Sequence, residues 1–203
     1  LDISLDVLGE DVTSRSGALR ARDAYLRLVD ALAPLGLAMR AEMSVKLSSF
    51  GQALQGGHEL ALAHATTVAE AAQGIGSALT LDMEDHTTTD STLAAHAELR
   101  SRFPRTGAVI QSYLFRSEDD CRELARAGAR VRLVKGAYRE PPAVAHQDKA
   151  DVDKAYVRCL KILMAGEAYP MVATHDTRLI SVAQDLAGRA GRDTDGYEYQ
   201  MLY

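Results

Sequence analysis

Seven short runs of strand-forming residues recur along the chain, separated by segments with helical periodicity. The runs span residues 3–8, 43–47, 78–82, 108–113, 131–137, 171–173 and 197–203. One intervening segment repeats its apolar residues every three or four positions, at Val152, Tyr156, Cys159, Leu160 and Leu163. That spacing predicts a helix with one buried stripe. The alternation favours βα units around a parallel sheet over a sandwich or a helical bundle.

Local residue chemistry predicts where one of these helices begins and ends. Ser117 is expected to be the N-cap, because three acidic residues follow it and would lie in the first turn. Gly128 suits the far end. The next strand is expected after almost no loop, as is usual between a helix and a strand in such folds.

Seven parallel strands at this spacing predict an α/β fold of the (βα)8 TIM-barrel type. A complete barrel typically needs roughly 250 residues, and this chain has 203. We therefore expect residues 1–203 to form a single, incomplete barrel domain that lacks the eighth strand and the final helix. The competing topology is an open doubly wound sheet, but no GxGxxG follows the first run, where a dinucleotide-binding fold would carry it.

Charge, hydrophobic run length and cysteine spacing argue against several classes of function. A net charge of −5 without clustered Lys or Arg argues against nucleic-acid binding. No apolar run approaches the roughly 20 residues of a membrane helix, which leaves only peripheral membrane contact open. Cys121 and Cys159 form no CxxC motif, so reduced, buried thiols and a cytoplasmic location are expected. Surface positions are expected for four histidines, which are His58, His64, His96 and His146.

Polar side chains stand at or near the carboxyl end of five consecutive runs, where barrel enzymes carry their active sites. They are Lys46, Asp82, Gln111, Arg132 with Lys135, and Thr174-His175-Asp176. Lys46 stands in an apolar run and needs a carboxylate or an anionic ligand, because an unpaired buried charge is costly. An ion pair with Asp82 is the plain structural interpretation. Polar groups on five strands together instead indicate a ligand site.

Cations and amides without a Cys or Ser nucleophile motif suit a planar, anionic ligand with polar edges. A flavin fits, and a second cation could bind the carboxylate of a small amino-acid substrate. Spacing alone does not separate a flavin from a sugar phosphate.

Several motifs, taken in order along the chain, resemble the proline dehydrogenase family, in particular its bacterial monofunctional members. They are LDVLGE (5–10), SVKL (44–47), LDMED (81–85), VIQSYL (109–114), RLVKGAY (132–138), ATHD (173–176) and YQMLY (199–203). The resemblance implies a flavoprotein oxidoreductase of proline catabolism on a distorted (βα)8 barrel. Such an enzyme oxidises L-proline to 1-pyrroline-5-carboxylate and passes electrons from its nucleotide cofactor, FAD, to a quinone.

The resemblance also implies a role for each matching residue. Arg132 matches the arginine beside the reactive nitrogen of the flavin, and Asp82 matches an active-site aspartate. Lys46 corresponds to the lysine that pairs with the substrate carboxylate, and Tyr138 to a tyrosine at the substrate ring. The implied cofactor contacts are Met83, Gln111, Val134, Lys135, Gly136, Ala137, Thr174 and His175.

One departure from the family pattern concerns the substrate clamp. Family members carry two adjacent arginines on a helix after the eighth strand, and this sequence has no Arg-Arg pair. A flavin-binding fragment without turnover is therefore one alternative. A second is a metal-assisted barrel enzyme, whose ligands would be Asp82, Glu84, Asp85, His86, His175 and Asp176. A third makes Lys135 a Schiff-base lysine.

Overall fold

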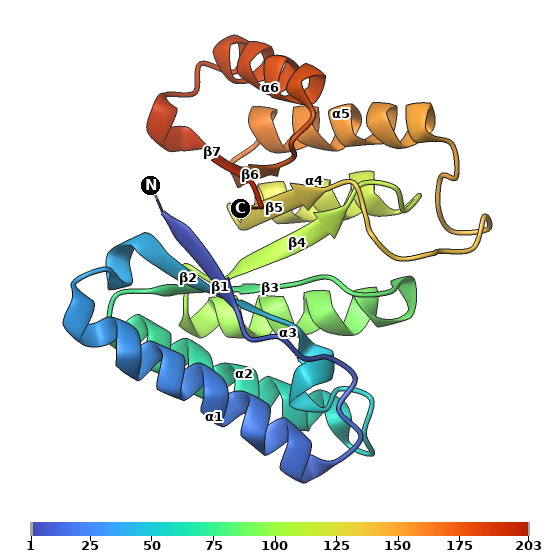
Figure 1. Ribbon diagram of the computed structural model, residues 1–203. Helices are drawn as coiled ribbons and strands as arrows, with labels where there is room; N and C mark the ends of the chain where they lie inside the picture. The colour runs from blue at the N-terminus through green and yellow to red at the C-terminus, as the bar shows by residue number, and fades with distance from the viewer. Residues whose placement is uncertain (1, 203) are drawn as a thin grey trace. The chain divides into compact units, whose positions relative to one another are not determined.

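The computed structural model describes residues 2–202, which form two compact units. The first comprises the residues up to Glu84 together with Thr88–Gly107, and the second comprises Asp85–Thr87 and the residues from Ala108 onward. Strands and helices alternate along both (Figure 1).

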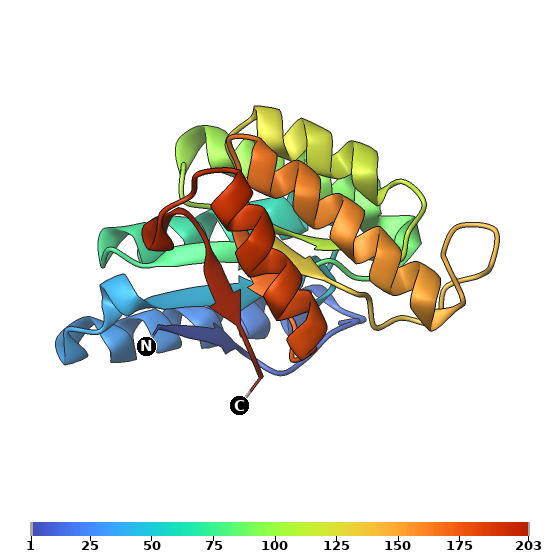
Figure 2. The same ribbon diagram turned by 90° about the horizontal axis from the view of Figure 1, so that it is seen from above.

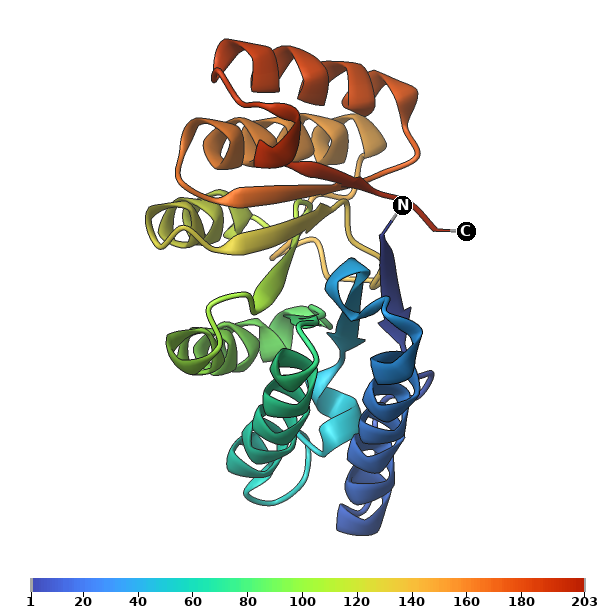
Figure 3. The ribbon, with the colours of Figure 1, turned by 90° about the vertical axis from the view of Figure 1, so that its left-hand side faces the viewer.

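The first unit is built on three parallel strands. Its strands are β1 (Ile3–Asp6), β2 (Ala41–Val45) and β3 (Ala78–Leu81), and its helices are α1 (Arg15–Leu32), α2 (Gly57–Gly74) and α3 (Thr89–Arg102). Short 3-10 helices are η1 (Ala33–Leu35), η2 (Ala38–Arg40) and η3 (Leu47–Phe50). In register, Asp6 lies opposite Ser44, and Ser44 lies opposite Thr80. Helices α1 and α2 pack side by side (Figure 3).

The core of the first unit gathers large side chains from its strands and helices. Helix α1 begins where the Ser14 hydroxyl accepts from the Gly17 amide at 3.1 Å. Its buried residues include Tyr25, whose ring meets Phe50 edge-on at 5.6 Å between centroids. Every residue of β2 and β3 is buried, as expected for parallel strands covered on both faces.

The second unit repeats the same βα pattern. Its strands are β4 (Gly107–Gln111), β5 (Arg130–Val134), β6 (Tyr169–Ala173) and β7 (Glu198–Gln200), and its helices are α4 (Ser117–Arg126), α5 (Lys149–Ala165) and α6 (Thr177–Arg189). Two 3-10 helices are η4 (His86–Thr88), whose last residue belongs to the first unit, and η5 (Thr194–Gly196). Strands β5, β6 and β7 pair in parallel. The Ser112 amide, just after β4, donates to Val134 O of β5 at 2.8 Å.

Helix α5 packs between α4 and α6 (Figure 2). Four of the five residues in its predicted stripe are buried, and Val152 is half-buried. The Tyr156 hydroxyl anchors α5 to the sheet by donating to Leu133 O at 3.1 Å. Cys121 and Cys159 are free and buried, which confirms the expected thiols.

All seven predicted strands are present, but several end earlier than expected. Strand β2 stops at Val45, because a 3-10 helix begins at Leu47 and closes at Gly51, whose φ is +90°. Strand β5 stops at Val134, two residues before Gly136, whose φ of +121° is outside the range of a regular strand. The last strand covers only 198–200, and Tyr203 lies outside the described residues.

Three other predictions were wrong. Ser117 is the first residue of α4 and not its N-cap, because its hydroxyl donates to Gln111 O. His64 is buried with its ring edge-on to Phe50. His96 is also buried, with Nε2 3.3 Å from Thr106 O, and burial lowers the pKa of His96 to about 4. The expected glycine at the end of α4, Gly128, is confirmed with φ +64°.

No helix between residues 2 and 202 is both long enough and apolar enough to cross a lipid bilayer.

Candidate active site

In the first unit, Lys46 lies immediately beyond the end of β2. Its ammonium is 2.8 Å from Asp6 Oδ2, and both side chains are partly exposed. The carboxylate that holds Lys46 is therefore Asp6 and not Asp82, which corrects the plain structural interpretation. Burial alone would lower the pKa of Lys46. The hydrogen bond and charge of Asp6, with the charges of Asp82 and Glu10, outweigh burial and raise the pKa of Lys46.

Asp82 follows β3 and is bound by its neighbour on β2. Both of its carboxylate oxygens are 2.9 Å from the Ser44 hydroxyl. Because Ser44 lies opposite Thr80 in the register, it is close to the residues that end β3. The serine hydroxyl thus orients the carboxylate at the carboxyl end of these strands.

The next two residues after Asp82 are buried. Met83 is 6 % exposed, and the Glu84 carboxylate accepts hydrogen bonds from the amide and hydroxyl of Ser48. Burial raises the pKa of Glu84, and the Ser48 hydrogen bonds oppose that shift. Glu84 therefore holds η3, the 3-10 helix that follows Lys46, in place.

In the second unit, Arg132 lies on β5 and is half-buried. Its Nε donates to Gln200 Oε1 at 2.6 Å, and Gln200 Nε2 donates to Glu198 Oε1 at 2.7 Å. Val131 and Leu133, on the opposite face of the strand, are fully buried. Alternation along β5 therefore places Arg132 on the other face, beside β7 residues.

The turn after β5 packs closely against the residues that follow β4. A Cβ added to Gly136 would be 2.5 Å from the ring of Tyr113, so glycine allows the backbone to lie against that ring. Gln111 is buried, and its Oε1 is 3.3 Å from the Tyr113 hydroxyl and 3.5 Å from the Ala137 amide. Burial, with help from Glu140, raises the pKa of Tyr113 to about 12.

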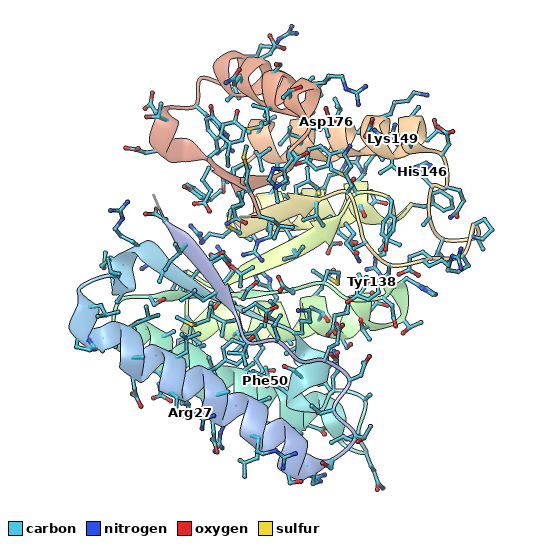
Figure 4. All side chains as sticks on the ribbon, in the orientation of Figure 1. Arg27, Phe50, Tyr138, His146, Lys149 and Asp176 are labelled. Atoms are coloured by element: carbon cyan, nitrogen blue, oxygen red, sulfur yellow. The ribbon has the colours of Figure 1, made fainter. Side chains whose placement is uncertain are left out.

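The segment that joins β5 to α5 carries Tyr138 and His146 (Figure 4). It is anchored by Glu140, a buried carboxylate. Glu140 Oε1 accepts from the His86 amide at 2.8 Å, and its Oε2 pairs with His86 Nδ1. Tyr138 is half-buried on this anchored segment.

Lys135 reaches toward helices α5 and α6. Its ammonium is 2.6 Å from Asp153 Oδ1 and 3.2 Å from Asp176 Oδ2. Burial would lower the pKa of Lys135, but the hydrogen bonds to Asp153 and Asp176 raise it overall. Lys135 is therefore held as a charged ammonium. Figure 4 labels Asp176 and the neighbouring Lys149, which also pairs with Asp153.

Thr174 and His175 follow β6. The Thr174 hydroxyl accepts from the Asp176 amide at 3.1 Å, and Asp176 caps α6 by accepting from the Arg178 amide. The hydrogen bond from Arg178 is the main reason why the pKa of Asp176 lies below its usual range. His175 is exposed, and its Nε2 accepts from the Leu202 amide at 3.1 Å.

The predicted residues thus form two groups, one in each unit. The first unit contains Lys46, Asp82 and Met83, and the second contains Gln111, Arg132, Val134, Lys135, Gly136, Ala137, Tyr138, Thr174 and His175. Their proposed contacts with cofactor or substrate stay predictions. Sequence reasoning missed four partners of these residues, which are Asp6, Tyr113, Glu140 and Gln200.

Three of the acidic and histidine residues in the metal-ligand alternative bind other groups of the protein. Glu84 is bound by Ser48, His86 by Glu140, and Asp176 by Lys135 and Arg178. Within the described residues, no three His, Cys, Asp or Glu side chains gather closely enough to hold a metal ion.

Comparison with known proteins identifies the family. The family model for proline dehydrogenase matches residues 1–203. The chain is 38% identical over 203 residues to proline dehydrogenase of Deinococcus radiodurans, covering 98% of this chain and 65% of that protein. It is 34% identical over 200 residues to proline dehydrogenase 1 of Bacillus subtilis strain 168, with the same two coverages. The chain thus spans about two thirds of the length of these relatives.

Solved structures agree with this family assignment. Proline utilization A from Bdellovibrio bacteriovorus, inactivated by N-propargylglycine, superposes with a TM-score of 0.91 and 25% identity over 100% of this chain and 26% of that one. The D779W mutant of proline utilization A from Bradyrhizobium japonicum superposes with a TM-score of 0.81 and 26% sequence identity. That match covers 98% of this chain and 23% of the other. These matches confirm the predicted α/β fold class of the TIM-barrel type. Motifs, fold and relatives agree, and the chain belongs to the proline dehydrogenase family.

Proposed function

We propose that the protein oxidises L-proline to 1-pyrroline-5-carboxylate with FAD as its cofactor, as an oxidoreductase of proline catabolism. Family membership over residues 1–203 is the observation that carries this proposal. Proline dehydrogenases are flavin-dependent enzymes. Bound FAD would supply the hydride acceptor for the proline ring carbon next to the nitrogen, and the proton on that nitrogen would be released as the C=N bond forms. The assignment of residues 1–203 to one incomplete catalytic barrel domain is part of the proposal.

The donor groups of the second unit fit a flavin. They combine a guanidinium at Arg132, a buried amide at Gln111 and a backbone turn at Gly136 that packs against the Tyr113 ring. A flavin ring needs hydrogen bonds at its polar edge and positive charge near its reactive nitrogen. We assign these to Arg132 and to the segment Val134–Ala137, with Thr174, His175 and Met83 as further contacts.

The residues that would serve the substrate carry different chemistry. The charged ammonium of Lys46 would bind the proline carboxylate, and Asp82 would order its surroundings. Tyr138 would pack against the proline ring. Holding the substrate carboxylate and ring fixes the reacting carbon, which supplies much of the catalytic advantage of a two-substrate reaction.

A quinone acceptor and contact with a membrane surface complete the proposal. Both follow from the resemblance to the family.

The Schiff-base alternative is not favoured by the contacts of Lys135. An amine attacks a carbonyl only when it is deprotonated, and such lysines have lowered pKa values. Asp153 and Asp176 instead raise the pKa of Lys135.

The direct test is spectroscopic. Purified protein is expected to be yellow, with the absorbance of bound FAD, and L-proline added without oxygen is expected to bleach it. D-proline at the same concentration is the control. If the protein cannot take up FAD, the cofactor assignment is wrong. If FAD binds but L-proline leaves the absorbance unchanged, the substrate assignment is wrong.

A further inference from the structure

The ion pair of Lys46 belongs to a longer chain of hydrogen bonds within the first unit. Asp6 Oδ2 accepts from Lys46 at 2.8 Å, while Asp6 Oδ1 accepts from the Tyr25 hydroxyl at 2.9 Å. Both carboxylate oxygens are therefore bound, one to a cation and one to a neutral hydroxyl. Two bonds to separate partners fix the plane of the carboxylate, which a single ion pair would leave free to rotate.

Tyr25 is a rigid anchor for this carboxylate. Its side chain is 1 % exposed within the core, and its ring contacts Phe50. Its hydroxyl shares its one hydrogen between Asp6 Oδ1 and Ser44 O, which is 2.6 Å away, and accepts from the Val7 amide at 3.2 Å. The hydroxyl thus touches β2 and the residue after β1, and so it fixes the two strand ends on which Lys46 and Asp6 are carried.

Lys46 itself needs such a partner. A lysine side chain has a long flexible stem and loses much rotamer freedom when its ammonium is held in one place. Among the contacts of the described residues, Asp6 is the one carboxylate within ion-pair distance of Lys46. The ammonium has three N–H donors, so its bond to Asp6 leaves two donors for other acceptors.

We propose that Asp6, held by Tyr25, is a positioning residue that fixes the Lys46 ammonium for a substrate carboxylate. This inference rests on the proposed function. Asp6 does not touch the substrate. It acts through Lys46, and Tyr25 acts through Asp6, so that the flexibility of Lys46 is reduced before the substrate arrives.

Positioning and charge make opposite predictions for Asp6→Asn. As a mere counter-charge, Asp6 would weaken the attraction between Lys46 and an anionic substrate, and its neutralisation would lower the KM for proline. If Asp6 instead positions Lys46, the loss of the ion pair would raise the KM for proline. We expect a rise of about tenfold, the scale of one hydrogen bond to a charged group, with kcat changed much less.

Tyr25→Phe separates the two roles further, since it removes a hydroxyl and leaves every charge in place. Positioning predicts that the KM rises by roughly threefold, whereas a charge effect predicts no change. Thermal unfolding and the FAD absorbance spectrum of each variant show whether it is folded and loaded. Asp2→Asn is the matched control, because Asp2 pairs with Arg40 at 3.0 Å and is exposed. Its KM is expected to be unchanged.

A second readout does not depend on turnover. The oxolane analogue of proline keeps the carboxylate and lacks the oxidisable amine, and its binding can be followed by the absorbance of bound FAD. Its Kd is expected to rise in Asp6→Asn and Tyr25→Phe in parallel with the KM. The alkaline limb of the KM profile is also expected to move to lower pH in Asp6→Asn, because Asp82 and Glu10 alone then raise the pKa of Lys46.

These experiments distinguish failure of the proposed function from failure of the positioning role of Asp6. If L-proline does not bleach the unaltered, FAD-loaded protein, the proposed function fails, and this inference with it. If the unaltered protein is bleached but Asp6→Asn binds proline and the analogue as well as before, or better, positioning by Asp6 is overturned while the function stands. An unchanged KM in folded Tyr25→Phe overturns the role of Tyr25.

Discussion

At the scale of single residues, Gly136 shows how one backbone position shapes the turn after β5. Its φ of +121° is accessible to glycine, and a Cβ there would be 2.5 Å from the Tyr113 ring. Tyr113 is buried and has little room to retreat. The turn after β5 therefore depends on the missing side chain.

Gly136→Ala is expected to destabilise the protein by about 2 kcal/mol, the scale of a strained backbone position with a steric clash. Urea unfolding measures this. Gly188→Ala is the matched control, because nothing lies within 4 Å of its Cβ position in α6, and alanine there should be neutral or stabilising. Equal effects of the two substitutions would contradict the packing argument.

Some residue identities could be read from the sequence, but their partners could not. Lys46, Arg132 and Lys135 stand out as cations in apolar runs, and the need for a partner follows from charge burial. Partners of these three residues lie 40, 68 and 18 residues away, at Asp6, Gln200 and Asp153. Strand register and side-chain rotamers select among the candidates, and neither appears in the linear pattern.

At the scale of elements, the segment between β5 and α5 is held by one buried carboxylate. Glu140 binds both the backbone and the ring of His86. Glu140 thereby ties η4 to the segment that carries Tyr138. Such an anchor limits the local opening that a long connection would otherwise show.

Glu140→Ala is expected to speed amide hydrogen exchange across Tyr138–Ala145, because the bonds to His86 are lost and the cavity is not refilled. Glu140→Gln is the control, since its amide oxygen can still accept from the His86 amide and should preserve most of the protection. If exchange in Glu140→Ala matches the unaltered protein, other contacts hold this segment.

The elements themselves were largely predictable, because period and burial agree with the alternation of strands and helices. Their ends were less so. The η3 helix after β2 and the turn at Gly136 after β5 shorten the expected strands. In both places the chain leaves the sheet at a candidate site residue. There the tertiary contacts, and not the strand propensity of the local sequence, decide the backbone conformation.

At the scale of the whole molecule, cofactor binding should stabilise the fold. A ligand that binds only the folded state adds about 2.7 kcal/mol at a free concentration of 100 times its Kd. FAD is therefore expected to raise the Tm of apoprotein, and the oxolane analogue to raise it further. NAD is the control nucleotide. A Tm unaffected by FAD would contradict the cofactor assignment.

The sequence by itself determined the fold class and the family, and it supplied the candidate site residues, whose roles stay predictions. Burial can be predicted from alternating periodicity, and the family can be identified from contiguous motifs. Both signals depend on residues that are close together in the sequence. The tertiary structure decided that Lys46 pairs with Asp6 rather than Asp82, that Tyr25 supports Asp6, and that His64 and His96 are buried. The physical reason is that hydrogen bonds between distant residues require angstrom-scale agreement of register and rotamer, which only the packed chain provides.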